Sequence, residues 1–370
     1  MNMKKIGIMT YHRSINFGAK LQAFALQNVL KEKYDTYIVD YRCEKIEAFF
    51  YPKKTLKSRL RNLARMILRP HYYRELKRRR NGFISFDTHF RMTECYTNNT
   101  IAKAKEEFDA FIVGSDQVWN LDISGNDMNY FLPFADDCQK YTYAVSFGTT
   151  IMEDDLLWSQ PELFSSFQSL LIREQSGVDF LNKLLPEKIC SCTVDPVFLL
   201  DKDTWVHTFR LEKKRIQKPY VLVYFVAKIQ QTYALAYAKR IASENNLQII
   251  YVNAGLPSDS GITYKNDVDP ISFLDLIYNA YIVITTSFHA EAFSILFNVP
   301  FMYELVKTEK NTNTRLSSLA ALFELEKQEI ASLETEPNIL INWKKVNSHL
   351  VLLRNASRNT LMDSLSSLGK

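Results

Sequence analysis

The sequence predicts an α/β fold with two Rossmann-like lobes, and three observations support this prediction. Strand-like apolar runs alternate with segments of helical periodicity, which is typical of βαβ units and parallel sheets. The alternation occurs in two successive sets, separated by a basic stretch over Lys213–Pro219. A length of 370 residues favours two domains over one. We expect a first lobe over residues 1–212, a second over 213–340, and a terminal helix over 341–370.

The first lobe opens with a βαβ unit. Lys5–Thr10 is expected to be a buried strand, an apolar stripe with helical spacing follows Asn16, and Tyr37–Tyr41 is the next strand. Such units imply a parallel sheet with right-handed crossovers. The remaining elements of this lobe are expected to be strands at Ala110–Val113 and Tyr141–Phe147, a helix from Pro161 to about Leu170, a short strand end at Leu171–Glu174, and a closing segment at Thr193–Leu200.

The second lobe begins with Tyr220–Val226, an unbroken apolar run of the kind that is buried on both faces of a parallel sheet. Asp269 has the features of an N-cap, with Pro270 at the first helical position. The other elements are expected to be strands at Gln248–Asn253, Ile282–Thr286 and Pro300–Glu304, and helices at Gln230–Asn245, from Pro270 to about Ala280, from about Ala290 to Asn298, at Asn313–Phe323, and within Asn342–Ser367.

One segment carries most of the positive charge. Lys53–Arg80 holds twelve Lys or Arg residues and one acid, so its charge of +11 leaves −6 on the rest of a chain whose net charge is +5. This basic helical excursion, over about residues 52–90, is interpreted first as a solvated helix. An alternative is that residues 53–80 contact the anionic surface of a membrane. No nucleic-acid fold signature accompanies the run, so nucleic acid is not an expected partner.

The compartment is expected to be the cytoplasm. No apolar run reaches the roughly 20 residues that cross a bilayer, and the first residues do not have the pattern of a secretory signal. The five cysteines show neither a CxxC pair nor zinc spacing, so we expect buried free thiols in a reducing compartment. The sequence also lacks GxGxxG, Walker A, HExxH and GxSxG motifs, so neither a metal nor a cofactor is expected.

The strongest candidate site lies where the predicted strand Ile282–Thr286 meets a helix. A helix N-terminus binds phosphate or carboxylate readily, and Ser287 could donate to such an anion there. His289 could act as a general acid or base near neutral pH. The alternative is that His289 is structural and only helps to cap the helix.

Polar residues also follow the other predicted strands, where ligands of open α/β sheets bind. Arg13, Asn16 and Gly18 follow the first strand; Asn16 could cap the helix, and Arg13 could complement an anion or be solvated. Asp116 and Asn120 follow the strand at Ala110–Val113, where Asp116 could accept from a sugar hydroxyl or cap a turn. Trp119 is interpreted as a core residue.

Three further cations and one acid remain ambiguous. Arg173 could hold a carboxylate through bidentate geometry or pair with the adjacent Glu174. Arg315 and Lys307 could serve an anionic donor or be structural. Glu304, at the end of a predicted strand, could bind a hydroxyl or cap an element.

Taken together, these segments resemble the polysaccharide pyruvyl transferase family. The matching stretches are Ile6–Leu26, Tyr37–Arg42, Phe108–Asn120, Tyr143–Gly148, Ile172–Gly177, Val194–Leu200, Ile284–Phe301 and Asn313–Leu319. They span the chain in the order found in the family, and their joint occurrence is specific.

The resemblance implies a glycosyltransferase-B-like fold with an interlobe cleft and a C-terminal helix that crosses back to the first lobe. It also implies transfer of the enolpyruvyl group of phosphoenolpyruvate to a sugar, which forms a pyruvate ketal in surface or capsular polysaccharide biosynthesis. The partners would be this small-molecule donor and a sugar or lipid-linked oligosaccharide acceptor. The family motifs match His289 as the acid or base and Arg173 as a donor ligand.

The sequence departs from the family pattern at one motif. Some members carry Arg-Leu-His where this chain has Ser287-Phe288-His289, so one cation is missing, and Arg315, Lys307 or Arg13 would have to replace it. Alternative functions are a nucleotide-sugar glycosyltransferase of the same fold, a non-catalytic glycan-binding protein, and a membrane-surface scaffold.

Overall fold

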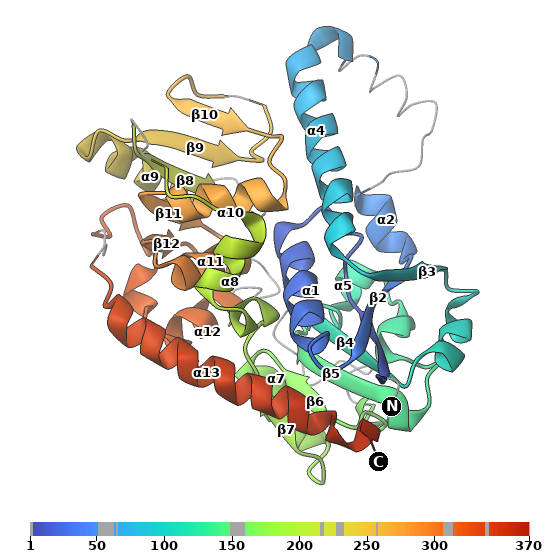
Figure 1. Ribbon diagram of the computed structural model, residues 1–370. Helices are drawn as coiled ribbons and strands as arrows, with labels where there is room; N and C mark the ends of the chain where they lie inside the picture. The colour runs from blue at the N-terminus through green and yellow to red at the C-terminus, as the bar shows by residue number, and fades with distance from the viewer. Residues whose placement is uncertain are drawn as a thin grey trace.

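Two parallel sheets form the protein, as the computed structural model shows (Figure 1). The first sheet has seven strands in the order β3-β2-β1-β4-β5-β6-β7, and the second has five in the order β10-β9-β8-β11-β12. All strand pairs in both sheets are parallel. The predicted class of two Rossmann-like lobes is therefore confirmed. The structure describes residues 3–50, 63, 66–148, 160–214, 218–226, 233–256, 258–305, 314–336 and 340–369.

The first sheet extends from residue 5 to residue 192. Its strands are β1 (Lys5–Met9), β2 (Asp35–Tyr41), β3 (Met92–Tyr96), β4 (Ala110–Asp116), β5 (Lys140–Val145), β6 (Leu170–Ile172) and β7 (Cys190–Cys192). The α-helices along this part of the chain are α1 (Phe17–Leu30), α2 (Glu44–Phe50), α4 (Pro70–Phe86), α5 (Leu121–Ser124), α6 (Glu162–Ser165) and α7 (Gln175–Leu184). The central strand β4 is buried along its whole length, as expected for a strand covered on both faces.

The second sheet extends from residue 220 to residue 303, so the predicted boundary at 212/213 falls between the two sheets. Its strands are β8 (Tyr220–Tyr224), β9 (Gln248–Val252), β10 (Ile262–Lys265), β11 (Ile282–Thr285) and β12 (Phe301–Tyr303). Helix α8 (Lys202–Phe209) precedes this sheet. The α-helices that follow along the described part of the chain are α9 (Tyr233–Glu244), α10 (Pro270–Asn279), α11 (Phe288–Phe297), α12 (Thr314–Leu322) and α13 (Trp343–Ser364).

Local signals located some elements well and others poorly. Asp269 accepts a hydrogen bond from Ser272 N at 2.7 Å and Pro270 opens α10, which confirms the predicted cap. The helix predicted from Pro161 to about Leu170 is wrong, because α6 ends at Ser165 and the chain then extends into β6. The edge strands β3 and β10 were not predicted, since they are short and only partly buried.

The C-terminal helix α13 crosses back to the first lobe, as the resemblance implied (Figure 1). Ser357 Oγ accepts from Val194 N at 3.1 Å, and Arg354 Nε donates to Phe198 O at 2.6 Å. Arg358 also pairs with Glu32 near the end of α1. The helix therefore ties the end of the chain to the lobe in which the chain began.

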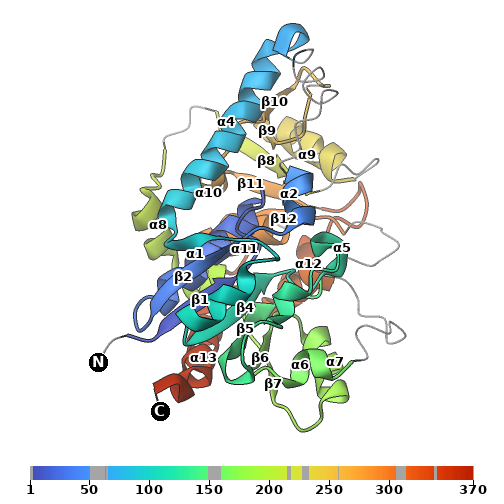
Figure 2. The same ribbon diagram turned by 90° about the vertical axis from the view of Figure 1, so that its right-hand side faces the viewer.

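The two lobes share a hydrophobic interface next to α1. Phe17, the first residue of α1, stacks on Phe273 of α10 with ring centroids 4.1 Å apart, and it contacts Tyr224 at 5.4 Å. The long helix α4 also reaches across, running beside β9 and β10 in both views (Figures 1 and 2). Gly82 of α4 lies so close to Asp269 that an added Cβ would be 2.5 Å from the Asp269 Cβ.

The cysteines and the helices bear on the expected compartment. All five cysteines are free, but only Cys43 and Cys190 are buried, so the expectation of buried thiols is wrong for the other three. No helix among the described residues is long and apolar enough to span a bilayer. Much of the basic excursion, including residues 53–62, lies outside the described residues.

Candidate active site

The candidate site is built around the start of α11, directly after the buried strand β11. Ser287 is the N-cap residue, and its side chain accepts from Ala290 N at 3.4 Å. The helix therefore begins at Phe288 and places His289 in its first turn. A strand that ends in a capped helix presents free backbone N–H groups and the positive end of the helix dipole at the carboxyl edge of the sheet.

The imidazole of His289 lies between the two lobes. On one side, the ring contacts Gly18 of α1, and a Cβ added to Gly18 would lie 1.9 Å from His289 Nδ1. On the other side, His289 Nε2 is 3.4 Å from Asp195 Oδ2 of the first lobe, without hydrogen-bond geometry. His289 is 7% exposed. Thus Ser287, not His289, caps the helix, and the histidine ring lies buried at the contact between the lobes.

Asp195 is the hub of this arrangement. Its carboxylate is fully enclosed: Oδ2 accepts from Arg173 Nη1 at 2.8 Å and from Ser115 Oγ at 3.4 Å, and Oδ1 accepts from Val197 N at 3.1 Å. Burial raises the pKa of Asp195, but His289, Arg173 and the Val197 N–H outweigh it and lower the pKa to about 2. Asp195 is therefore a buried anion that links residues of both lobes.

Arg173 follows β6 and is surrounded by carboxylates. Its Nε donates to Glu174 Oε1 at 3.1 Å, and Nη1 is 3.8 Å from Asp116 Oδ1. Burial alone would lower the pKa of Arg173, but Glu174, Asp195 and Asp116 raise it above its usual value. The guanidinium also lies 4.5 Å from the ring centre of Phe288, a cation–π contact between the lobes. Its Nη2 is buried without a partner among the described residues.

Arg315, in the first turn of α12, adds a second guanidinium to this region. Its Nε is buried and has no hydrogen-bond partner in the part of the chain that the structure describes. Burial lowers the pKa of Arg315 to about 10, and the positive charge of Arg173 adds to this effect, while Asp116 and Glu174 oppose it. Arg173 and Arg315 therefore act on each other electrostatically and both keep an unused donor, a pattern that favours an anionic ligand.

Glu291 also lies in the first turn of α11. The residue is fully buried, and neither carboxylate oxygen has a partner among the described residues. Burial raises the pKa of Glu291 well above its usual value. A protonated Glu291 carries no charge and would not repel an anion beside His289.

Several other predicted residues have roles away from this cluster. Asn16 caps α1 by accepting from Ala19 N at 3.3 Å, as predicted. The Arg13 guanidinium is held by Asp40 at 2.7 and 2.8 Å and by Glu47 at 3.0 Å, so it is not an available donor ligand in this arrangement.

Glu304 and Asn120 also have protein partners. The two Glu304 oxygens accept from Tyr233 N at 3.1 Å and Ala234 N at 2.8 Å, so Glu304 caps α9 instead of facing a hydroxyl. Asn120 Nδ2 donates to Gln117 Oε1 at 3.1 Å. Trp119 is fully buried, as predicted. Lys307 lies outside the described residues.

Sequence reasoning did not single out Asp195 or Ser115. Asp195 lies in the Val194–Leu200 stretch that carries part of the family resemblance, but nothing local assigns it a role. Its partners come from residues 115, 173 and 289, which only the tertiary structure brings together. Among the described residues, no group of three or more His, Cys, Asp or Glu side chains could hold a metal ion.

Comparisons with known proteins place this arrangement in a family. No curated protein matches the chain significantly by sequence. A UDP-GlcNAc 2-epimerase from Neisseria meningitidis is similar in structure, with 11% identity and a TM-score of 0.49 over 96% of this chain and 99% of that one. An O-GlcNAc transferase mutant from Thermobaculum terrenum has 10% identity and a TM-score of 0.49 over 99% of this chain and 66% of that one.

These structural similarities are too distant to indicate a shared substrate, and the fold class rests on the sheets themselves. The sequence comparison is more specific. A family model described as polysaccharide pyruvyl transferase matches residues 16–303, a range that includes Gly18, Arg173, Asp195 and His289. The match covers most of the chain, and the chain therefore belongs to the polysaccharide pyruvyl transferase family.

Proposed function

We propose that this protein transfers the enolpyruvyl group of phosphoenolpyruvate to sugar hydroxyls and forms a pyruvate ketal during surface or capsular polysaccharide biosynthesis. One observation carries the proposal: Arg173 Nη2 and Arg315 Nε are buried without partners among the described residues, and Arg173 lies against Phe288 at the start of α11. Leaving a buried charged donor unpaired is costly, so such groups in a native site call for a ligand.

The chemistry of the donor suits these groups. Phosphoenolpyruvate carries a carboxylate and a phosphate, which guanidinium groups and helix N-termini bind well. Arg173 is oriented by Asp195, Glu174 and Phe288, so its free Nη2 has a fixed position. Arg315 supplies a second cation where Ser287 stands in place of the arginine of some family members. We therefore assign donor binding to Arg173, Arg315 and the start of α11.

The proposed reaction needs a proton carrier, and His289 fills this role. Protonation of C3 of the donor by His289 makes C2 electrophilic. The oxygen of one sugar hydroxyl then attacks C2, and its proton passes to a base. The bond between the C2 oxygen substituent and C2 breaks as phosphate leaves, and a second hydroxyl attacks C2 to close the ketal ring while its proton passes to the departing phosphate. Asp195 is ionised and lies 3.4 Å from Nε2, so it would stabilise positive charge on the imidazole.

The acceptor is assigned less directly. Asp116 is 6% exposed and is the last residue of β4, 3.8 Å from Arg173, and Asn120 follows four residues later. We propose that both contact the acceptor sugar beside the donor. The reaction requires no cofactor beyond the phosphoenolpyruvate that it consumes.

The experiment measures phosphate release from phosphoenolpyruvate in the presence of sugar acceptors. General acid–base catalysis contributes on the order of 10²–10⁴-fold, so His289→Ala should lose about that factor in kcat while keeping its melting temperature within a few degrees. His207→Ala, an exposed histidine on α8, is the matched control and should retain full activity. Wild-type turnover by His289→Ala would exclude the mechanism. Stabilisation by nucleotide sugars and not by phosphoenolpyruvate in a thermal-shift assay would favour a glycosyltransferase instead.

We also propose a cytoplasmic enzyme that touches the anionic inner surface of the membrane through residues 53–80. Among the described residues of this segment, Met66, Ile67 and Leu68 are 45%, 67% and 77% exposed. Exposed apolar side chains beside basic ones are typical of peripheral membrane contacts. This location would bring the site close to a lipid-linked oligosaccharide acceptor.

A further inference from the structure

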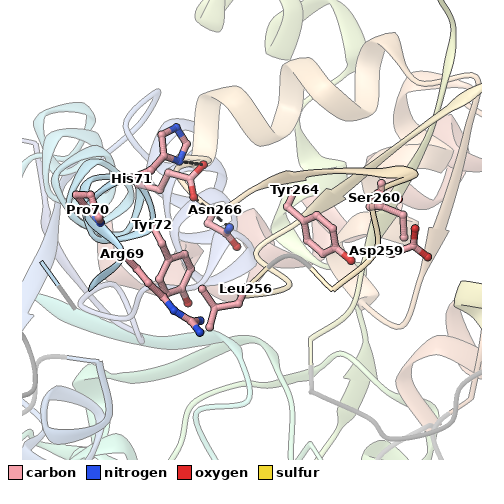
Figure 3. A pocket seen from close by; sticks show the side chains of 11 residues that line it. Arg69, Pro70, His71, Tyr72, Leu256, Asp259, Ser260, Tyr264 and Asn266 are labelled. Atoms are coloured by element: carbon pink, nitrogen blue, oxygen red, sulfur yellow. Dashed lines mark hydrogen bonds and ion pairs between the residues drawn. The ribbon is translucent and has the colours of Figure 1, made fainter. Parts of the chain in front are cut away.

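A second polar site lies well away from His289, in a cavity of about 600 Å³ between the start of α4 and the region around β10 (Figure 3). One wall comes from the first lobe, with Arg69, Tyr72 and Glu75. The other comes from the second lobe, with Leu256, Tyr264 and Asn266. The volume of this cavity falls in the usual range of ligand sites.

The polar groups in this cavity are held in place by buried contacts. Asn266 is 2% exposed; its Oδ1 accepts from Gly255 N at 3.0 Å, and its Nδ2 donates to Glu75 Oε2 at 3.2 Å. Glu75 is 9% exposed. Among the described residues, Glu75 Oε1 has His71 Nδ1 as its partner in an ion pair at 3.7 Å, which is beyond hydrogen-bond length. A fixed carboxylate oxygen with spare capacity is therefore available to a donor in the cavity.

The apolar part of the cavity combines two tyrosine rings with aliphatic side chains. Tyr264 stacks on Tyr251 with centroids 6.0 Å apart, which fixes the ring, and Tyr72 stands on the opposite wall. Leu256 is 42% exposed at the same place. Rigid aromatic rings next to a hydroxyl-accepting carboxylate form a surface suited to a sugar ring, which has apolar faces and polar edges.

The charged groups of the lining nearly balance one another. Glu75 and Asp259 are carboxylates, Arg69 is a guanidinium, and Asp259 pairs with Lys239 at 2.5 Å. A neutral sugar that donates a hydroxyl to Glu75 Oε1 needs no further countercharge from this lining.

One face of α4 runs from the cavity to the packed residues beside the candidate active site. Tyr72, Glu75, Arg79 and Phe83 recur at helical spacing, and Phe83 contacts Phe17, the neighbour of Gly18 and hence of His289. Arg79 Nε is buried on this face without a partner among the described residues. With a rise of about 1.5 Å per residue, Tyr72 and Phe83 are roughly 16 Å apart along the helix, a span of several sugar units.

We propose that this cavity is a distal subsite that binds a sugar unit of an elongated acceptor glycan, several units away from the one that receives the ketal. Tyr264 and Tyr72 pack against the sugar ring, and Glu75 accepts a hydroxyl. The inference rests on the proposed function only in taking a glycan as the acceptor. It deepens that function, because it makes the acceptor an oligosaccharide or a polymer instead of a single sugar.

The test measures glycan binding without any donor. Wild-type protein is applied to a printed array of bacterial surface glycans, and the best-bound oligosaccharide is titrated by calorimetry. Tyr264→Ala and Glu75→Gln should each raise Kd about tenfold or more. Tyr264→Phe keeps the ring and should bind like the wild type. Tyr281→Ala removes an exposed tyrosine that does not line the cavity and serves as the matched control.

The outcomes separate this inference from the proposed function. Absence of glycan binding, or equal Kd values for the wild type and Tyr264→Ala, would overturn the distal subsite. Phosphate release from phosphoenolpyruvate with short acceptors could still be normal in that case. Conversely, Tyr264-dependent glycan binding by a protein that never releases phosphate would support the subsite and reject the transfer reaction.

Discussion

Gly18 and His289 touch across the two lobes, and no side chain fits between them: a Cβ on Gly18 would lie 1.9 Å from Nδ1 and 2.3 Å from Cγ of the imidazole. The start of α1 therefore fixes the position of a ring that belongs to α11. Every larger residue at position 18 must move that ring or push the lobes apart.

Gly18→Ala should therefore displace His289 and reduce kcat by about 10²-fold, since a shift of about 1 Å in a catalytic group can have this effect. The melting temperature should also fall. The double variant Gly18→Ala/His289→Ala removes the clash and should recover most of the lost stability, although not the activity. Additive losses in the double variant would show that the two residues do not interfere with each other.

Asp195 should make the protein acid-sensitive. Its folded-state pKa of about 2 lies below the ordinary 3.8, so its ionised form stabilises the folded state above about pH 4. This contribution, about 2 kcal/mol, is lost as the pH falls from about 4 towards 2. Urea unfolding of the wild type and Asp195→Asn at about pH 6 and pH 3 measures it. The difference in the free energy of unfolding between the wild type and Asp195→Asn should be smaller at pH 3 than at pH 6.

The same substitution tests whether Asp195 positions the catalytic groups. Asp195→Asn cannot stabilise positive charge on His289 as a carboxylate does. We therefore expect a lower maximal kcat and also a shift of the pH profile of kcat along the pH axis. A variant with reduced stability but an unchanged pH profile would show that Asp195 is only structural.

Glu291 should have the opposite dependence on pH. Burial raises the pKa of Glu291 in the folded state above the ordinary value of 4.5. Its contribution to the free energy of unfolding is therefore present at low pH and is lost as the pH rises above 4.5. Glu291→Gln cannot ionise, so the melting temperature of this variant should rise relative to that of the wild type as the pH is raised from about 5 to 8. A constant difference across this range would mean that Glu291 finds a partner for its charge.

The exposed residues 66–68 should contribute to membrane binding. Replacing Met66, Ile67 and Leu68 by Ser should reduce co-sedimentation with vesicles that contain anionic lipid, and added salt should reduce it for the wild type. Vesicles of neutral lipid are the control. Co-sedimentation that is equal with neutral and anionic vesicles, or absent with both, would leave this segment as a solvated helix.

The sequence was sufficient for the order of the main elements and for the position of His289, because both depend on local patterns. Apolar runs located the central strands, and Asp269 marks a helix start by its own side chain. Edge strands such as β10 were missed, since four residues that are only partly buried give almost no periodic signal.

The partners of the site residues could be identified only from the tertiary structure. Arg13 resembled an anion ligand until Asp40, 27 positions later, was found to hold it. Glu304 caps a helix that begins 71 positions earlier. Asp195 gains its partners from three other elements. In each case the decisive partner is distant in sequence, so spacing alone could not reveal it.

The most direct test of the account is the affinity of the protein for phosphoenolpyruvate, measured by calorimetry for the wild type, Arg315→Met and the exposed control Arg74→Met. A hydrogen bond to a charged group contributes about 1.5–3 kcal/mol, so Arg315→Met should raise Kd about tenfold to a hundredfold while Arg74→Met leaves it unchanged. Equal affinity in all three proteins, or no binding by the wild type, would contradict a donor site between Arg173 and Arg315.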